Sequence, residues 1–380
     1  MQKPHIKLIE IIWEVTGKCN NKCNYCGSKE VNDNVIAEGK ISRILDKICE
    51  FPPENIDISG GDPLLLSYEV HKEIVTKLKN AGVCVKIVVN PKSFDNNIAV
   101  VVDDLMFLKY KSILSLYDFI GVSVSTHTEI SKAKEFFTKY PELACKSTII
   151  TNFNVNNVFL FNKIKWLVQS FKSFWQIQYT MFKNPDDTQA LYNNEAALYE
   201  FFIDHLAKAV AENIPIVLAD NMNCNSCTAG MHSIGILDDG TVVPCLSMRS
   251  WLENIYGVSQ GNILDKGLEE IWKQQFTEYR INNFYCCKDS CKEKQIDMTS
   301  REFVVKVNGY KTKNIPLKPY FDEQEKTLPV FPHKPYFDEQ EKIPVFPHPN
   351  RDPLQITVLY GVFPWGGQTY SIKKEGNDIE

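Results

Sequence analysis

Residues 13–26 read Trp-Glu-Val-Thr-Gly-Lys-Cys-Asn-Asn-Lys-Cys-Asn-Tyr-Cys and place Cys19, Cys23 and Cys26 in a Cys-x3-Cys-x2-Cys pattern. The pattern directly follows an apolar run that is typical of a strand. Thiolates are natural ligands of iron–sulfur clusters, and three on one loop can hold three irons of a [4Fe–4S] cube while the fourth stays open. Because an open iron can bind a substrate or cofactor, the spacing indicates a catalyst.

The loop resembles the signature of the radical SAM superfamily, including the aromatic Tyr25 directly before the third cysteine. The resemblance implies that the three thiolates hold a catalytic cluster, whose open iron chelates S-adenosylmethionine (SAM) and whose electron cleaves it to a 5′-deoxyadenosyl radical. The alternatives are a zinc knuckle or unrelated thiols. Zinc would need a fourth protein ligand nearby, and neither His nor Cys follows until Cys49.

Composition limits the possible classes of protein. With 380 residues and 44% hydrophobic content, the chain can bury a sizeable core, and its length suggests two or three domains. A net charge of −5 and a pI near 5.9 give no electrostatic footprint for nucleic acid. No signal peptide and no apolar segment of about 20 residues is found, so we expect no membrane association and a cytoplasmic location. Twelve cysteines in such a chain favour metal ligation or redox chemistry over disulfides.

Up to about residue 184, strand-like apolar runs alternate with amphipathic stretches such as Ile41–Glu50 and Tyr68–Ala81. Alternation of this kind predicts an α/β fold with a parallel sheet and crossover helices. Six units are too few for a closed eight-stranded barrel. The family resemblance makes them a partial (β/α)6 TIM-like barrel, with its site at the carboxyl ends of the strands. The six candidate strands are Leu8–Val15, Ile56–Ser59, Cys84–Asn90, Phe119–Ser125, Ser147–Asn152 and Gln176–Phe182.

Residues at several predicted strand ends match cofactor contacts of the resembled family. Gly60-Gly61-Asp62-Pro63 follows the second strand and is similar to the family's Gly-Gly-Glu-Pro loop, which receives the methionine amino group. Glycines permit close backbone approach and the Asp62 carboxylate can accept from an ammonium, although its side chain is one methylene shorter than that of Glu. Such a segment can also be only a turn. The resemblance places further contacts, to the ribose and carboxylate, at Asn90, Ser123 and Ser125, although a serine in a strand is usually satisfied by local backbone.

A second cysteine-bearing region begins at Cys224 and Cys227. Asp239-Gly240, between two apolar runs, predicts a hairpin that carries Cys245 on its returning strand. The spacing Cys227-x12-Gly240-x4-Cys245 resembles the SPASM and twitch extensions that hold auxiliary iron–sulfur clusters, and residues 261–272 look like the helix-bearing stretch that follows that hairpin.

Cys287-x3-Cys291 resembles the end of the full SPASM cysteine series, but the rest of that series is missing. We therefore expect one auxiliary [4Fe–4S] cluster, bound by Cys227, Cys245, Cys291 and either Cys224 or Cys287. The alternative is a zinc ribbon, whose paired thiols would look similar. The remaining thiols on apolar stretches are interpreted as small core residues: Cys49, Cys84 and Cys145.

Beyond residue 301 the composition changes, since ten of the nineteen prolines fall in the last eighty residues. Lys318–Lys326 recurs residue for residue as Lys334–Lys342, and Pro-Val-Phe-Pro-His follows each copy. The repeat is too polar and proline-rich to build a core, and two copies are too few for a solenoid. We predict a barrel domain at 1–215, an auxiliary β-hairpin and helix domain at 216–300, and an extended tail at 301–380.

The resemblance favours a peptide maturase, because most relatives with a SPASM or twitch region act on peptides or proteins. The tail is then a candidate substrate fused to its own enzyme, or alternatively a linker or a docking arm. The expected partners are a peptide substrate and an electron donor such as flavodoxin or ferredoxin. Two alternatives stay open: a small-molecule radical SAM dehydrogenase of the twitch type, and a non-catalytic peptide-binding or electron-transfer protein. The candidate modification sites in the tail are Tyr320, Phe321, Phe331, Tyr336, Phe337, Phe346, Phe363 and Trp365.

Overall fold

The computed structural model describes most of the first 180 residues and several later segments. The described residues are 7–19, 21, 23, 26, 38–94, 103–153, 157–179, 205–206, 208–209, 212–218, 229–246, 261–274, 276, 295–297 and 304–306. The predicted tail beyond residue 306, with its repeat and its candidate modification sites, lies outside them. No helix within the described residues is both long and apolar enough to cross a membrane.

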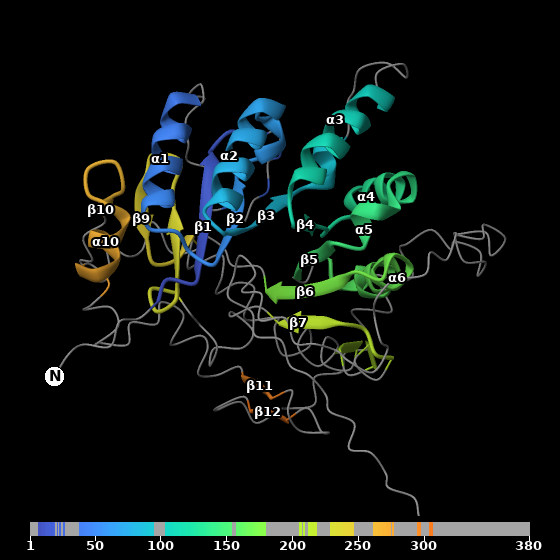
Figure 1. Cartoon of the computed structure of the whole chain (residues 1–380). Helices are drawn as coiled ribbons and strands as arrows, with labels where there is room; N and C mark the ends of the chain where they lie inside the picture. Colours follow the sequence, from blue (N-terminus) through green and yellow to red (C-terminus); the bar gives the residue numbers. More distant parts are fainter. Residues whose placement is uncertain are drawn as a thin grey trace, which may run out of the picture.

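The first part of the chain alternates strand and helix as predicted, and the α/β fold with its parallel sheet is confirmed (Figure 1). All six predicted strands are present, and each described boundary lies within three residues of the prediction. The strands are β1 (Glu10–Thr16), β2 (Asn55–Gly60), β3 (Cys84–Val89), β4 (Phe119–Ser123), β5 (Ser147–Phe153) and β6 (Phe174–Tyr179). The helices between them are α1 (Glu38–Glu50), α2 (Tyr68–Asn80), α3 (Asp103–Leu116), α4 (His127–Lys139), the short α5 (Pro141–Ala144) and α6 (Phe161–Phe171).

The sheet extends beyond the six predicted strands at both edges. Its order is β10-β9-β8-β1-β2-β3-β4-β5-β6-β7, and every neighbouring pair from β8 to β7 is parallel. β7 (Ile216–Leu218) follows β6, whereas β8 (Ser233–Ile236) pairs with β1 and turns into antiparallel β9 (Thr241–Val243) and β10 (Gly261–Asn262). The predicted hairpin is thus present, and it continues the sheet of the barrel at the β1 edge.

Two short strands lie apart from this sheet. β11 (Gln295–Asp297) pairs antiparallel with β12 (Val304–Lys306). The domain boundary predicted after residue 300 therefore falls between two paired strands, and the boundary predicted after residue 215 falls directly before β7.

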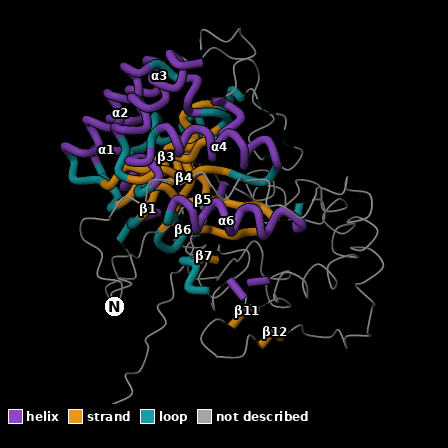
Figure 2. Tube along the Cα trace, turned by 90° about the vertical axis from the view of Figure 1, so that its right-hand side faces the viewer, coloured by secondary structure: helices purple, strands orange, loops and turns teal. Residues whose placement is uncertain are grey.

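The two faces of the sheet differ in chemistry because successive side chains of a strand point to opposite sides. The helices lie along one face, where Ile11, Trp13 and Val15 of β1 pack into the main hydrophobic core (Figures 1 and 2). The other face carries many polar side chains, and we call it the inner face. The register of the strands assigns to it Glu10, Ile12, Glu14, Asp57, Ser59, Lys86, Val88, Ser123, Thr148, Ile150, Asn152, Gln176 and Gln178.

Three charged side chains of the inner face form a buried cluster. Nζ of Lys86 lies 3.2 Å from Oε1 of Glu10 and 3.7 Å from Oδ2 of Asp57, and all three residues are at most 4% exposed. Burial raises the pKa of Glu10 well above its usual value and also raises the pKa of Asp57. Burial alone would lower the pKa of Lys86, but the two carboxyl groups outweigh it and the pKa is raised. Lys86 thus compensates two acids that have no access to water.

Replacing Lys86 by Met should destabilise the protein by about 3–5 kcal/mol, because two buried carboxyl groups lose their cation. Lys77→Met is the matched control, since Lys77 pairs with Asp46 and Glu73 at 2.8 and 3.1 Å on the surface, where its side chain is 40% exposed. The control should cost less than about 1 kcal/mol. Urea unfolding followed by circular dichroism measures both values. Equal losses in the two variants would contradict a buried ionic cluster.

Candidate functional site

The three cysteines of the predicted cluster loop lie beyond the carboxyl end of β1. Cys19, Cys23 and Cys26 are all partly buried, and none of them is part of a disulfide. Sγ of Cys19 accepts a hydrogen bond from the backbone N–H of Asn21 at 3.3 Å, and the N–H of Cys26 donates to the carbonyl of Cys23 at 3.3 Å. Tyr25 lies outside the described residues. The loop therefore turns on itself and presents its thiols at one end of the sheet.

The loop that follows β2 is hydrogen-bonded to the start of the cysteine loop. The N–H of Gly61 donates to the carbonyl of Thr16 at 2.6 Å, and the N–H of Asp62 donates to the carbonyl of Lys18 at 2.8 Å. A Cβ atom at Gly60 would lie 2.3 Å from the Thr16 carbonyl oxygen, and one at Gly61 would lie 2.2 Å from that of Lys18. Gly60 also has a φ of +129°. Only glycines allow the two loops to approach this closely.

Both carboxylate oxygens of Asp62 already have partners within the protein. Oδ1 accepts from the N–H of Leu64 at 3.1 Å and caps a short 3-10 helix (Pro63–Leu65), while Oδ2 accepts from the hydroxyl of Ser93. Burial raises the pKa of Asp62, and its hydrogen bonds with Ser93 and Leu64 act in the opposite direction. The side chain is 2% exposed and joins the loop after β2 to the 3-10 turn after β3 (Pro91–Phe94). Direct contact between Asp62 and a cofactor remains a prediction.

The buried side chain of His71 also contacts the loop that follows β2. Nε2 of His71 lies 3.0 Å from the carbonyl of Pro63, and Nδ1 lies 2.6 Å from the hydroxyl of Tyr117. A neutral ring that donates from Nε2 and accepts at Nδ1 satisfies both contacts. Burial lowers the pKa of His71 to about 4. The neutral ring thus anchors Pro63 to α2.

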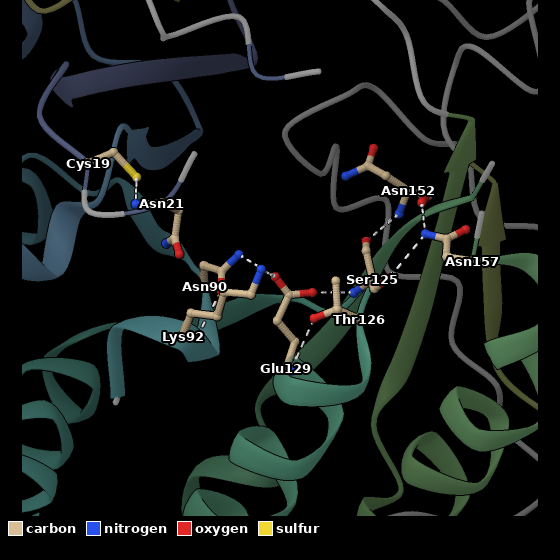
Figure 3. A network of polar contacts seen from close by, with 9 residues as sticks. All are labelled: Cys19, Asn21, Asn90, Lys92, Ser125, Thr126, Glu129, Asn152 and Asn157. Carbon is tan, nitrogen blue, oxygen red and sulfur yellow. Dashed lines mark hydrogen bonds and ion pairs between the residues drawn. The ribbon is translucent and has the colours of Figure 1, made fainter. Parts of the chain in front are cut away.

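A second polar network links the ends of β3 and β4 to the start of α4 (Figure 3). Nδ2 of Asn90 donates to Oε1 of Glu129 at 2.9 Å, and the N–H of Ser125 donates to Oε2 at 2.7 Å. Nζ of Lys92 lies 3.4 Å from Oε1. Glu129 is 1% exposed, so its carboxylate is a buried hub for two residues that the sequence suggested, Asn90 and Ser125.

The hydroxyl of Ser125 pairs with backbone, but with the backbone of the neighbouring strand β5 and not with the local backbone that the sequence suggested as the alternative. Its Oγ accepts from the N–H of Asn152 at 3.3 Å, and its carbonyl accepts from Nδ2 of Asn157 at 3.2 Å (Figure 3). Ser123 is the last residue of β4 and lies on the inner face, half-buried. The structure thus brings Asn90 and Ser125 into one network, with Ser123 two residues before Ser125 at the end of β4.

The three thiols lie in an environment that favours a cation. Burial raises the pKa of Cys19, and the charges of Asp62, Cys26 and Cys23 raise it further, against the hydrogen bond from Asn21. Three thiolates near a buried carboxylate would repel one another unless a metal cluster compensates them. Among the described residues, no three His, Cys, Asp or Glu side chains already converge as a metal site. The fit of a cluster therefore rests on the donor chemistry of three thiols on one loop.

The auxiliary hairpin has the predicted turn. Gly240 has a φ of +91°, and its N–H donates to the carbonyl of Leu237 at 2.9 Å. Oδ1 of Asp239 accepts from the N–H of Thr241 at 2.8 Å. The helix predicted to follow is α10 (Leu268–Gln274), and it buries Leu268, Ile271 and Trp272.

Strand direction separates the described auxiliary cysteine from the first cysteine loop. β8 runs parallel to β1 with Ser233 opposite Glu10, and β9 returns antiparallel with Val243 opposite Gly235. Cys245 follows β9 and so lies toward the amino end of β1, whereas Cys19 follows its carboxyl end. The seven residues of β1 separate the two by on the order of 20 Å. The other predicted auxiliary ligands lie outside the described residues: Cys224, Cys227, Cys287 and Cys291.

The comparison with protein families gives one match. Residues 227–292 match SPASM, described as an iron–sulfur cluster-binding domain. The match begins at Cys227 and includes Cys245, Cys287 and Cys291. This part of the chain is therefore a SPASM region. The match assigns iron–sulfur cluster binding to this region.

Several solved structures share the fold of this chain. Two of them are crystal structures of SuiB from Streptococcus suis. One, titled as bound to precursor peptide SuiA, is 12% identical, has a TM-score of 0.51, and covers 73% of this chain and 67% of that one. The other is 13% identical with a TM-score of 0.50, and covers 73% of this chain and 68% of that one. At this level of identity the likeness shows the fold.

Curated proteins match only a short part of the chain. A probable GTP 3′,8-cyclase of Methanococcus maripaludis is 38% identical over 69 residues, which are 17% of this chain and 23% of that protein. The match thus spans less than a quarter of that relative, and activity and substrate are proposals for this chain.

Sequence reasoning missed several residues that shape the candidate site. Glu129 had a signal, because Thr126-x-x-Glu129 is a capping-box pattern and Oγ1 of Thr126 accepts from the N–H of Glu129 at 3.3 Å. The Glu129 carboxylate binds the N–H of Ser125 instead of that of the cap residue. Ser93 and His71 had no local signal, since their partners lie 31 and 8 residues away.

One interpretation of the remaining thiols is wrong. Cys145 was expected in the core, but it is exposed because it follows the short α5, and its thiol donates to the carbonyl of Glu142 at 3.0 Å. Cys49 and Cys84 are partly buried, and Cys49 packs against the hydrophobic core as expected.

The neutral state of His71 predicts a pH dependence. Its folded pKa of about 4 lies below its ordinary value of 6.5, so the unfolded chain binds the proton more readily. The resulting stability is present above pH 6.5 and is lost as the pH falls toward 4, by about 3 kcal/mol at about 1.4 kcal/mol per pKa unit. His71→Gln keeps a donor and an acceptor but does not titrate. Urea unfolding at several pH values should show a smaller loss in the variant, and equal pH profiles would contradict the assignment.

Proposed function

We propose that the protein is a radical SAM enzyme that cleaves SAM reductively and removes a hydrogen atom from a peptide or protein substrate. The observation that supports this most is the direct hydrogen bonding of the Cys19–Cys26 loop to the Gly60–Asp62 loop at neighbouring strand ends. These hydrogen bonds support the proposal, because they keep the proposed thiol ligands next to the loop proposed to receive the methionine end of SAM. When bound and reduced, cluster and cofactor together supply the hydrogen-abstracting radical.

Each residue of the site has a role in this proposal. Cys19, Cys23 and Cys26 ligate the catalytic cluster. The backbone of Gly60 and Gly61 lies against the cysteine loop and receives the methionine amino group, with Asp62 and Pro63 fixing the shape of the loop. At the ends of β3 and β4, the residues proposed to contact the ribose and carboxylate of the cofactor are Asn90, Ser123 and Ser125. The buried Glu129 carboxylate orients Asn90 and the Ser125 backbone.

The auxiliary cluster has its own proposed ligands and role. Cys227, Cys245, Cys291 and either Cys224 or Cys287 hold it, and the position of Cys245 toward the amino end of β1 supports a location at the opposite end of the sheet from the catalytic cluster. A cluster at that end can accept the electron released when a substrate radical is oxidised, or can bind the peptide. An external donor such as flavodoxin or ferredoxin supplies the initiating electron. The cysteine content supports a reducing compartment, the cytoplasm.

Cysteine substitutions test the catalytic cluster. C19A, C23A and C26A should each lose the iron of one cluster and should form no more 5′-deoxyadenosine than a protein-free control, because no other thiol of the loop can replace the missing ligand. C145A is the matched control and should match the wild type, since its thiol is exposed and outside the site. Iron analysis and chromatography after anaerobic reconstitution with SAM and a strong reductant measure both quantities. Product formation by the three variants at the wild-type rate would refute the assignment.

The substrate is tested on the chain's own tail. We expect that residues 301–380, which the covalent link presents at roughly millimolar effective concentration, lose two hydrogens or take up one deuterium when the reaction runs in heavy water. Mass spectrometry of the tail locates the change and separates cross-linking from epimerisation. An unchanged tail beside newly formed 5′-deoxyadenosine would show that the tail is not the substrate.

A small-molecule reaction is the second candidate, because of the similarity to proteins named probable GTP 3′,8-cyclase. The same reconstituted protein, incubated with GTP and SAM, should leave GTP unchanged if the peptide proposal holds. Consumption of GTP together with an unchanged tail would favour the second candidate.

A further inference from the structure

Gln176 occupies a position on β6 where a polar side chain needs a partner. It is 0% exposed and lies between Ile150 of β5 and Val217 of β7 in the register of the sheet. Its neighbours Trp175 and Ile177 belong to the core under the helices, so Gln176 lies on the inner face. The side chain is thus enclosed on the polar side of the sheet, two apolar residues flanking it.

Neither the amide nitrogen nor the amide oxygen of Gln176 has a hydrogen-bond partner in the part of the chain that the structure describes. Buried polar groups are nearly always paired, because each unpaired one loses its hydration without compensation. Gln178, two residues along the same face, shows the usual state, since its Nε2 donates to Oδ1 of Asn152 at 2.5 Å. The contrast indicates that Gln176 is kept for a group that arrives from outside the fold.

We propose that Gln176 binds an amide of the substrate, a peptide bond or a side-chain carboxamide, on the inner face of the sheet. A primary carboxamide presents one acceptor and one donor side by side in a plane, and an amide presents the complementary pair. The inference rests on the proposed function, since it takes the inner face as the substrate's side of the barrel.

The depth of Gln176 separates it from the predicted cofactor loops. Three residues of β6 follow it before the strand ends at Tyr179, which is about 10 Å. The loops that carry Gly61 and Asn90 lie beyond the ends of their strands. A group bound to Gln176 therefore lies deeper in the barrel than those loops, on the side where a substrate would face the cofactor.

The stability of the free protein gives the first test. Gln176→Met keeps the volume but removes two unpaired polar atoms, so the unfolding temperature of the full-length, anaerobically purified protein should rise by about 2 °C or more. Gln178→Met is the matched control on the same face, and it should lower the unfolding temperature because Asn152 loses its partner. A fall for Gln176→Met similar to that of the control would overturn the proposal, since Gln176 would then be satisfied within the fold.

Amide binding gives the second test, with N-methylacetamide as the probe. In protein labelled with 15N at the glutamine side chains, the Gln176 signal is the one missing from the Gln176→Met spectrum. It should shift in a saturable manner as N-methylacetamide is added, while the Gln178 signal should not. Absence of a shift up to molar concentrations would overturn the proposal.

The third test asks whether Gln176 binds the cofactor instead of the substrate. The edge of the adenine ring of SAM also carries a hydrogen-bond donor beside an acceptor, so it could pair with the Gln176 amide. SAM should leave the Gln176 signal in place and should not compete with N-methylacetamide, and Gln176→Met should bind SAM with wild-type affinity in equilibrium dialysis. Competition by SAM would assign Gln176 to the cofactor and overturn the proposal. Failure of the wild-type protein to bind SAM at all would instead contradict the proposed function, so the two failures are distinguishable.

Discussion

Pairing of β1 on both sides holds the site together. The strand is buried along its whole length and is bonded in parallel to β2 and to β8. The carboxyl end of β1 leads into the cysteine loop. The hydrogen bonding between β1 and β2 continues beyond the strands, where the N–H groups of Gly61 and Asp62 donate to the backbone of Thr16 and Lys18. A slip of one residue would turn Glu10 toward the helices and remove the Lys86 cluster from the inner face, so the register is strongly fixed.

The polar inner face is what distinguishes this sheet from an ordinary parallel sheet, whose strands are apolar on both sides. Buried charges such as Glu10, Asp57 and Lys86 cost stability unless they are mutually paired, and the structure pairs them. The amide of Gln176 on the same face has no such partner among the residues that the structure describes. A polar inner face of this kind is suited to binding a polar ligand, which agrees with the proposal that the substrate binds on this face.

Much of the fold could be predicted because its signals are local. Alternation of apolar runs located β1 to β6, and Asp239-Gly240 located the hairpin. β7 was missed because three residues, Ile216–Leu218, carry no periodicity, and the pairing of β8 with β1 joins segments more than 200 residues apart. The candidate site likewise has some residues with a local sequence signal and others without one. The spacing of Cys19, Cys23 and Cys26 is readable from the chain, whereas the contact of Asp62 with Ser93 and the Lys86 cluster depend on the register of separate strands.

The proposed function requires that the loop after β1 holds an iron–sulfur cluster with one iron open to SAM. Anomalous diffraction from crystals of the reconstituted protein with SAM, recorded at the iron and zinc absorption edges, tests it most directly. The account predicts iron at Cys19, Cys23 and Cys26, with the fourth iron ligated by the amino and carboxylate groups of SAM beside Gly61. A single zinc ion with four protein ligands at that loop would contradict it.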